Sequence, residues 1–266
     1  MNWIKARNFI VNINANDYYT MNNYERYAPF IILFFLFLII LILKGFIRSN
    51  SRLEKDIRLV FSFITGITIS FYYIGNWLIL GVDINNLPFH LCYLCTILSI
   101  ILSLNKNKKI FNFLLVCGVI GGLSSFIAID WSLSSSYFKY YKFTISHIAI
   151  IILPIYFIVI HNYKLKIKEL LEVFIQVEIL SIVAGIFNSY FKTNYFFVSF
   201  TDNFAARGSI LEGLGNGYKY FINLQIVGII YFFTIFIMLK ILEFRKAKLN
   251  NYNIFIGKND YLKKHI

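Results

Sequence analysis

Apolar residues dominate seven stretches of the chain, and connecting segments separate them, of which 129–142 and 190–219 are long. The stretches cover residues 29–47, 57–80, 87–104, 110–128, 143–161, 168–189 and 220–242. A run of about 18 or more apolar residues is long enough to cross the hydrocarbon core of a bilayer as a helix. The pattern therefore predicts an all-α protein, a polytopic membrane helix bundle with about seven transmembrane helices.

Positive charge is distributed unevenly between the connecting segments. Lys and Arg gather after the first, third and fifth stretches and in the C-terminal tail, and cytoplasmic loops carry such an excess. We therefore expect the N-terminus outside and the C-terminus inside. This orientation divides the chain into an extracellular arm (1–28), a transmembrane domain (29–242) and a basic cytoplasmic tail (243–266), and predicts a multi-pass protein of the plasma membrane.

The overall composition supports a membrane protein. Hydrophobic residues make up 58% of the chain and aromatic residues 19%, with a mean hydropathy of +0.65. The net charge of +13 would suggest nucleic acid as a partner for a soluble protein. Here the basic residues lie mainly in short loops, where they meet anionic headgroups. The expected partners are therefore membrane lipids and not nucleic acid, and the sequence leaves the oligomeric state open.

Several polar side chains fall at a similar depth, within roughly 5–8 Å of the predicted outer boundary at 1.5 Å of helix rise per residue. They are Asn76, His90, His147, Asn188, Asn223 and Gln225. Polar groups in lipid usually face a bundle interior or a wet cavity, so a shared layer predicts a pocket that opens outward. The alternative is that each one caps a helix end or touches headgroups. Glu178 lies deeper, where it needs a proton, a histidine or an amide partner.

Histidine is the usual general base near neutral pH, so His90 and His147 are the candidate catalytic residues. Cys92 is a candidate nucleophile, although on a helix it shares a face with small residues and lies about 200° from His90, as expected for a helix contact. Cys92 and Cys95 lack the second pair of ligands that a structural zinc site needs. We assign no metal and no cofactor.

Two motifs carry a resemblance to a known family. Residues 87–92, LPFHLC, resemble the Leu-Pro-x-His-Leu-Cys signature of the YwaF-type bacterial integral membrane proteins. Residues 188–197, NSYFKTNYFF, are similar to that family's Asn-x-x-x-x-Thr-Asn-Tyr motif, with Asn188, Thr193, Asn194 and Tyr195 at the matching positions. Residues 214–220, LGNGYKY, resemble a Leu-Gly-Pro-Trp-Pro-x-Tyr segment that ends at Tyr220, without its prolines and tryptophan.

The resemblance implies lipid acyl chemistry, because the eukaryotic relatives of that family are multi-span phospholipid acyltransferases and more distant ones are lipid-ester hydrolases. Their nucleophile is a cysteine directly before the motif histidine, where this chain has Phe89. Either the nucleophile has moved, to Cys92 or to a hydroxyl such as that of Thr65 or Thr68, or the protein does not use that mechanism.

The sequence thus predicts a lipid acyltransferase or lipid-ester hydrolase with a polar pocket in the outer leaflet and histidine as base. The predicted catalytic residues are His90, His147 and Cys92. The predicted substrate-binding residues are Asn76, Glu178, Asn188, Thr193, Asn194, Tyr195 and Tyr220. Two other functions stay open: a small-molecule transporter or substrate-binding membrane protein, and a non-catalytic structural membrane protein.

Overall fold

The computed structural model describes residues 3–11, 22–128, 136–198, 200 and 210–264, and every regular element in these residues is a helix. The α-helices are α1 (Trp3–Ile10), α2 (Asn23–Ser49), α3 (Ser51–Leu80), α4 (Leu91–Asn105), α5 (Lys108–Phe113), α6 (Val119–Ala128), α7 (Tyr137–His161), α8 (Ile167–Phe191) and α9 (Gly217–Lys264). Shorter elements are the 3₁₀ turns η1 (Ile84–Asn86), η3 (Tyr195–Phe197) and η4 (Ile210–Leu214), and the π-helical segment η2 (Leu114–Gly118). The all-α prediction is confirmed.

Six helices of the described chain are long and apolar enough to cross a membrane, and α5, η2 and α6 together form one of them. The seventh predicted stretch is α4, which has 15 residues and is therefore about 22 Å long, short of a hydrocarbon core of about 30 Å. Following the predicted orientation, we call the helix ends near Asn50, Lys106 and Asn162 the inner ends and the opposite ends the outer ends.

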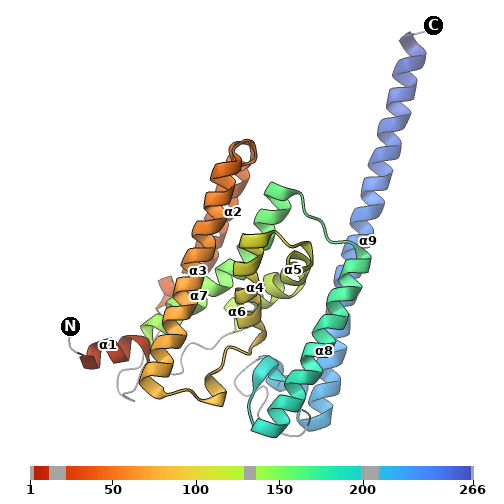
Figure 1. Cartoon of the computed structure of the whole chain (residues 1–266). Helices are drawn as coiled ribbons and strands as arrows, with labels where there is room; N and C mark the ends of the chain where they lie inside the picture. Colours follow the sequence, from red (N-terminus) through yellow and green to blue (C-terminus); the bar gives the residue numbers. More distant parts are fainter. Residues whose placement is uncertain (1–2, 12–21, 129–135, 199, 201–209, 265–266) are drawn as a thin grey trace.

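Helix α7 lies at the centre of the bundle, with α2, α3, α4 and α6 packed around it (Figure 1). From residue 148 to residue 160 its sequence is apolar on all sides, which is the pattern of a fully surrounded helix. Helices α8 and α9 lie side by side at one flank, and α9 continues past the inner ends of the other helices (Figure 1). The side chains that reach furthest into the interior therefore come from α7.

A tight hairpin joins α2 to α3. The backbone N–H of Asn50 donates to the carbonyl of Ile47 at 3.3 Å, and its side-chain oxygen accepts the N–H of Leu53 at 3.0 Å. One residue thus ends α2 and caps α3, as asparagine often does at a helix start. Because of this cap, α3 begins at Ser51 and not at 57 as the apolar pattern predicted. The charged residues between these positions are helical.

The continuous segment of η2 and α6 approaches α7 through two glycines, Gly118 at the end of η2 and Gly122 in α6. A Cβ atom added at Gly118 would lie 2.9 Å from the carbonyl oxygen of Ile150, and one at Gly122 would lie 2.7 Å from the side chain of Ile151. Proline at 154 leaves that same Ile150 carbonyl without its helical donor. Small residues at helix contacts allow such backbone approach in membrane proteins, so the two glycines set the distance between α6 and α7.

The starts of α4 and α7 also differ from the predicted ones, and both changes affect the site. Helix α4 begins at Leu91, so the prediction that His90 lies three or four residues inside this helix is wrong. Pro88 has no N–H and favours extended backbone before it, and the chain stays non-helical up to His90. Helix α7 begins at Tyr137 and not at 143, because Ser136 accepts the N–H of Lys139. This earlier start places Lys142 inside the helix.

Candidate functional site

His90 lies at the outer end of α4, where it occupies the N-cap position without a side-chain capping bond. Its imidazole packs among three aromatic rings, at centroid distances of 5.0 Å to Tyr195, 5.7 Å to Phe197 and 5.9 Å to Tyr93. Burial, together with the nearby Lys142 ammonium, lowers the pKa of His90 to about 4. The ring is therefore neutral at pH 7.

Asn188, at the outer end of α8, organises the loop that follows this helix. Its side-chain nitrogen donates to the carbonyls of Tyr195 and Val198, both at 2.7 Å. Its side-chain oxygen accepts the Thr193 hydroxyl at 2.7 Å and the Tyr195 N–H at 2.9 Å. An amide side chain offers two donors and two main acceptor positions, so Asn188 is fully occupied by the loop. The Asn-x-x-x-x-Thr-Asn-Tyr spacing is thus the spacing of a buried loop anchor.

Tyr195 links this loop to the segment that precedes His90. Its hydroxyl donates to the carbonyl of Ile84 and accepts the N–H of Leu87, the latter at 3.0 Å. Burial raises the pKa of Tyr195, so the hydroxyl keeps its proton and remains a donor. Tyr220, at the start of α9, donates from its hydroxyl to the carbonyl of Phe197 at 2.6 Å. The two motifs of the sequence therefore meet in space, and residues of α8, α9 and the loops fix the position of His90.

Lys142 is the functional candidate that the sequence analysis missed. Only 2% of this residue is exposed, although it lies near the outer end of α7. Its Nζ donates to the Tyr93 hydroxyl at 2.7 Å and lies 4.4 Å from the centroid of the Tyr72 ring and 4.0 Å from that of Tyr93. In the sequence, Lys142 lies one residue before an apolar run. A lysine in that position ordinarily extends toward the lipid headgroups, which is why the sequence analysis did not select it.

Cys92 lies in the first turn of α4 and is partly buried. Its thiol is close enough to Lys142 for the two groups to interact electrostatically. The face that it shares with Cys95, Thr96 and Ser99 is packed, since these three residues are at most 1% exposed. Cys92 therefore lies at the edge of a helix contact and beside the buried ammonium.

His147 lies in α7, one and a half turns further in than Lys142, and is 2% exposed. Its Nδ1 is 2.8 Å from the carbonyl oxygen of Phe143, and its ring stacks on the Phe143 ring at 3.8 Å. A carbonyl accepts only, so Nδ1 carries the hydrogen and Nε2 presents a lone pair. Nε2 is buried without a hydrogen-bond partner in the described part of the chain.

The two candidate histidines have different surroundings. His90 contacts aromatic rings of α4 and η3, whereas His147 contacts Phe126 of α6 and Phe143 of its own helix. The Lys142 ammonium is near enough to act electrostatically on both imidazoles. Lys142, which the sequence analysis did not select, is thus the group that relates the three predicted catalytic residues to one another.

The remaining predicted residues fall into two groups. Asn76 is buried in α3, and its side-chain oxygen has no hydrogen-bond partner among the described residues; the same holds for the side-chain oxygen of Asn194. Glu178 lies at the contact between α8 and α9, where the amide nitrogen of Gln225 donates to its carboxylate at 2.9 and 3.0 Å. Its partner is thus an amide, one of the options that the sequence left open.

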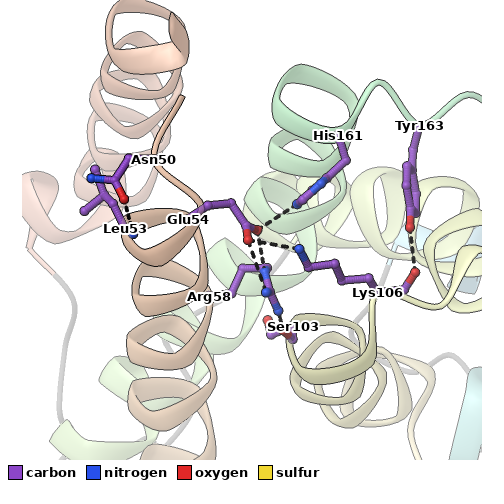
Figure 2. A network of polar contacts seen from close by, with 8 residues as sticks. All are labelled: Asn50, Leu53, Glu54, Arg58, Ser103, Lys106, His161 and Tyr163. Atoms are coloured by element: carbon purple, nitrogen blue, oxygen red, sulfur yellow. Dashed lines mark hydrogen bonds and ion pairs between the residues drawn. The ribbon is translucent and has the colours of Figure 1, made fainter. Parts of the chain in front are cut away.

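A second polar cluster lies at the inner ends of α3, α4 and α7 (Figure 2). The buried carboxylate of Glu54 bonds Arg58 at 2.5 Å, Lys106 at 2.9 Å and Nε2 of His161 at 2.7 Å. Arg58 also donates to the carbonyl of Ser103. A buried charge normally needs such partners. We therefore interpret this cluster as a structural clamp, that is, a set of ion pairs that joins α3, α4 and α7. Across the described residues, no group of three His, Cys, Asp or Glu side chains could hold a metal ion.

Comparison with known proteins identifies a family. A family model described as the TMEM164 family matches residues 18–236, which include all the residues of the outer-end site. No curated protein and no solved structure matches the chain.

Proposed function

The chain belongs to the TMEM164 family of multi-span membrane proteins, and from this premise we propose that it transfers or hydrolyses an acyl group of a membrane lipid ester. The reaction takes place among the outer ends of α3, α4 and α7, with His147 as the general base. The resemblance of residues 87–92 and 188–197 to the YwaF-type proteins supports acyl chemistry, and the burial of the polar groups at this end supports a site there.

The observation that carries the proposal is the free Nε2 of His147. Its Nδ1 is held by the Phe143 carbonyl, so ring orientation and tautomer are both fixed. Nε2 is left as an unpaired acceptor inside the protein, and buried polar atoms without a partner are rare unless they have a role. An acceptor of this kind takes a proton from an attacking S–H or O–H group, which is the function of a general base.

We take Cys92 as the nucleophile, because its thiol lies in the first turn of α4 beside the Lys142 amine. Sγ forms a bond to the ester carbonyl carbon, and the thiol proton passes to Nε2 of His147. The C–O bond to glycerol then breaks, and the glycerol oxygen takes that proton. Water or the hydroxyl of a second lipid next attacks the thioester carbon, a new C–O bond forms as the C–S bond breaks, and the proton of the attacking group reaches Sγ through His147.

Direct attack by a hydroxyl on the lipid ester uses the same base without a covalent intermediate. Among the hydroxyls named by the sequence, that of Thr68 donates to the carbonyl of Ile64 at 2.7 Å, so it is engaged within its own helix. A water molecule or the hydroxyl of an acceptor lipid is then the attacking group.

Mass spectrometry of the intact purified protein, after incubation with an ester phospholipid, separates the two routes. With Cys92 as nucleophile we expect one acyl adduct that hydroxylamine removes, that is absent in Cys92→Ala and that remains in the matched variant Cys117→Ala. Lysophospholipid formation without an adduct indicates direct attack. If wild type and His147→Gln leave every phospholipid and neutral glyceride ester unchanged, the proposed function is refuted.

A further inference from the structure

The amine of Lys142, which is charged when protonated, lies inside the bundle, where lysine side chains are seldom buried. Its position is five residues after the start of α7 at Tyr137, or about 8 Å along the helix. A lysine at this depth normally extends its side chain toward the headgroups. Here the residue is 2% exposed, because α3 and α4 hold the ammonium inside the bundle.

The surroundings compensate this charge only in part. An ammonium has three N–H donors, and the Tyr93 hydroxyl accepts one of them at 2.7 Å. The rings of Tyr72 and Tyr93 lie 4.4 and 4.0 Å away and add cation–π attraction. No carboxylate of the described residues forms an ion pair with Lys142. Buried charges are normally paired, so an anionic group that reached Lys142 would supply the partner that this amine lacks among the described residues.

A second polar group on the same helix face is also without a partner. Ser146 lies four residues after Lys142, and residues at this spacing are neighbours on a helix surface. It is 2% exposed, and its hydroxyl has no hydrogen-bond partner in the described part of the chain. The face of α7 that points to α3 and α4 thus offers a cation and a hydroxyl to one acceptor-rich group.

We propose that Lys142 binds the phosphodiester group of a phospholipid. At this outer end of the bundle, the abundant anionic group is the lipid phosphate, which lies at the boundary between headgroups and hydrocarbon. The exposed Lys139, one turn before Lys142, adds positive charge on the approach. Tyr93 and Cys92, the neighbours of Lys142 on α4, are only partly buried, so a lipid phosphate would approach Lys142 from their side. This inference concerns binding and stands independently of the proposed acyl chemistry.

The test uses lipids that separate phosphate from ester. A diether phosphatidylcholine carries the phosphodiester without an ester, diacylglycerol carries the esters without a phosphate, and a fatty acid offers a carboxylate. Binding to the purified full chain in detergent is measured by native mass spectrometry. We expect the diether lipid to bind wild type at least about tenfold more tightly than diacylglycerol or the fatty acid, as one charged hydrogen bond would give.

The matched variants are Lys142→Met and Lys139→Met, which remove the same charge from the same helix. Lys142→Met should weaken diether binding about tenfold or more, and Lys139→Met by less than about threefold. Because burying a charge without an ionic partner costs free energy, Lys142→Met should keep the melting temperature of the lipid-free protein or raise it.

Three results would overturn the inference: equal binding of diether lipid and diacylglycerol by wild type, unchanged diether binding by Lys142→Met, or a marked fall in the lipid-free melting temperature of that variant. If Lys142→Met does not fold, the lysine is structural, and the wild-type comparison of the lipids still decides whether phosphate is recognised. Since the diether lipid has no ester, its binding can be measured whether or not the protein turns over acyl groups. Equally, a failure of the diether lipid to bind would not by itself refute the acyl chemistry.

Discussion

Replacing Asn188 by Ala tests whether this side chain holds the outer-end loop and, through Tyr195, the segment before His90. The substitution removes four hydrogen bonds, to the carbonyls of Tyr195 and Val198 and from the Thr193 hydroxyl and the Tyr195 N–H. At about 1 kcal/mol each, they contribute about 4 kcal/mol to closing the loop. Every 1.4 kcal/mol is a factor of ten, so the loop should open about a thousandfold more often.

Hydrogen–deuterium exchange reports this opening at two places. The N–H of Tyr195 bonds Asn188, and the N–H of Leu87 bonds the Tyr195 hydroxyl, so both amides should exchange about a hundred to a thousand times faster in Asn188→Ala. The matched variant is Asn194→Ala, whose side-chain oxygen has no hydrogen-bond partner among the described residues, and it should change exchange little. Unchanged exchange at Tyr195 would refute the anchoring role, and a change there without one at Leu87 would refute the coupling to the His90 segment.

Two further predictions concern the stability of the bundle. Glu54→Gln leaves the buried Arg58 without its carboxylate and should destabilise the protein by about 3–5 kcal/mol. The control Glu172→Gln changes an exposed residue and should change stability little. Thermal unfolding in detergent compares the two variants, and equal melting temperatures would contradict the role of Glu54 in joining the three helices. Gly118→Ala should lower the melting temperature, because the added Cβ would lie 2.9 Å from a backbone oxygen of α7. Gly121→Ala should not, because nothing lies within 4 Å of its added Cβ. An unchanged melting temperature in Gly118→Ala would show that the segment of η2 and α6 is free to move away from α7.

The spans were predictable because an unsatisfied polar backbone is costly in lipid, so a spanning segment must be a long apolar helix. Such helices appear in the sequence as long runs of apolar residues. Helix starts were less predictable, since polar caps lie outside the apolar windows. Asn50 and Ser136 each extend a helix beyond its apolar run. These two caps explain why Glu54 and Lys142, which sit in the added turns, were not recognised as interior residues.

The polar residues of the site show a similar division. The sequence selected Asn188 and Tyr195 through a motif, but their bonding to Thr193, Ile84 and Leu87 depends on loops that meet only in three dimensions. The Nε2 of His161 lies 2.7 Å from the Glu54 carboxylate, a partner that the apolar pattern of the sequence does not indicate. Depth along a helix follows from sequence, whereas the partner across the bundle depends on how the helices rotate and pack.

The most direct test of the proposed acyl chemistry is the rate at which purified protein, in vesicles of ester phospholipid, releases lysophospholipid or transfers the acyl group. Wild type should turn over, His147→Gln should lose about a hundredfold or more because the base is removed, and His161→Gln, which alters a histidine at the inner ends, should stay within about threefold of wild type. Equal rates for wild type and His147→Gln, or a wild-type rate no higher than that of protein-free vesicles, would contradict the account.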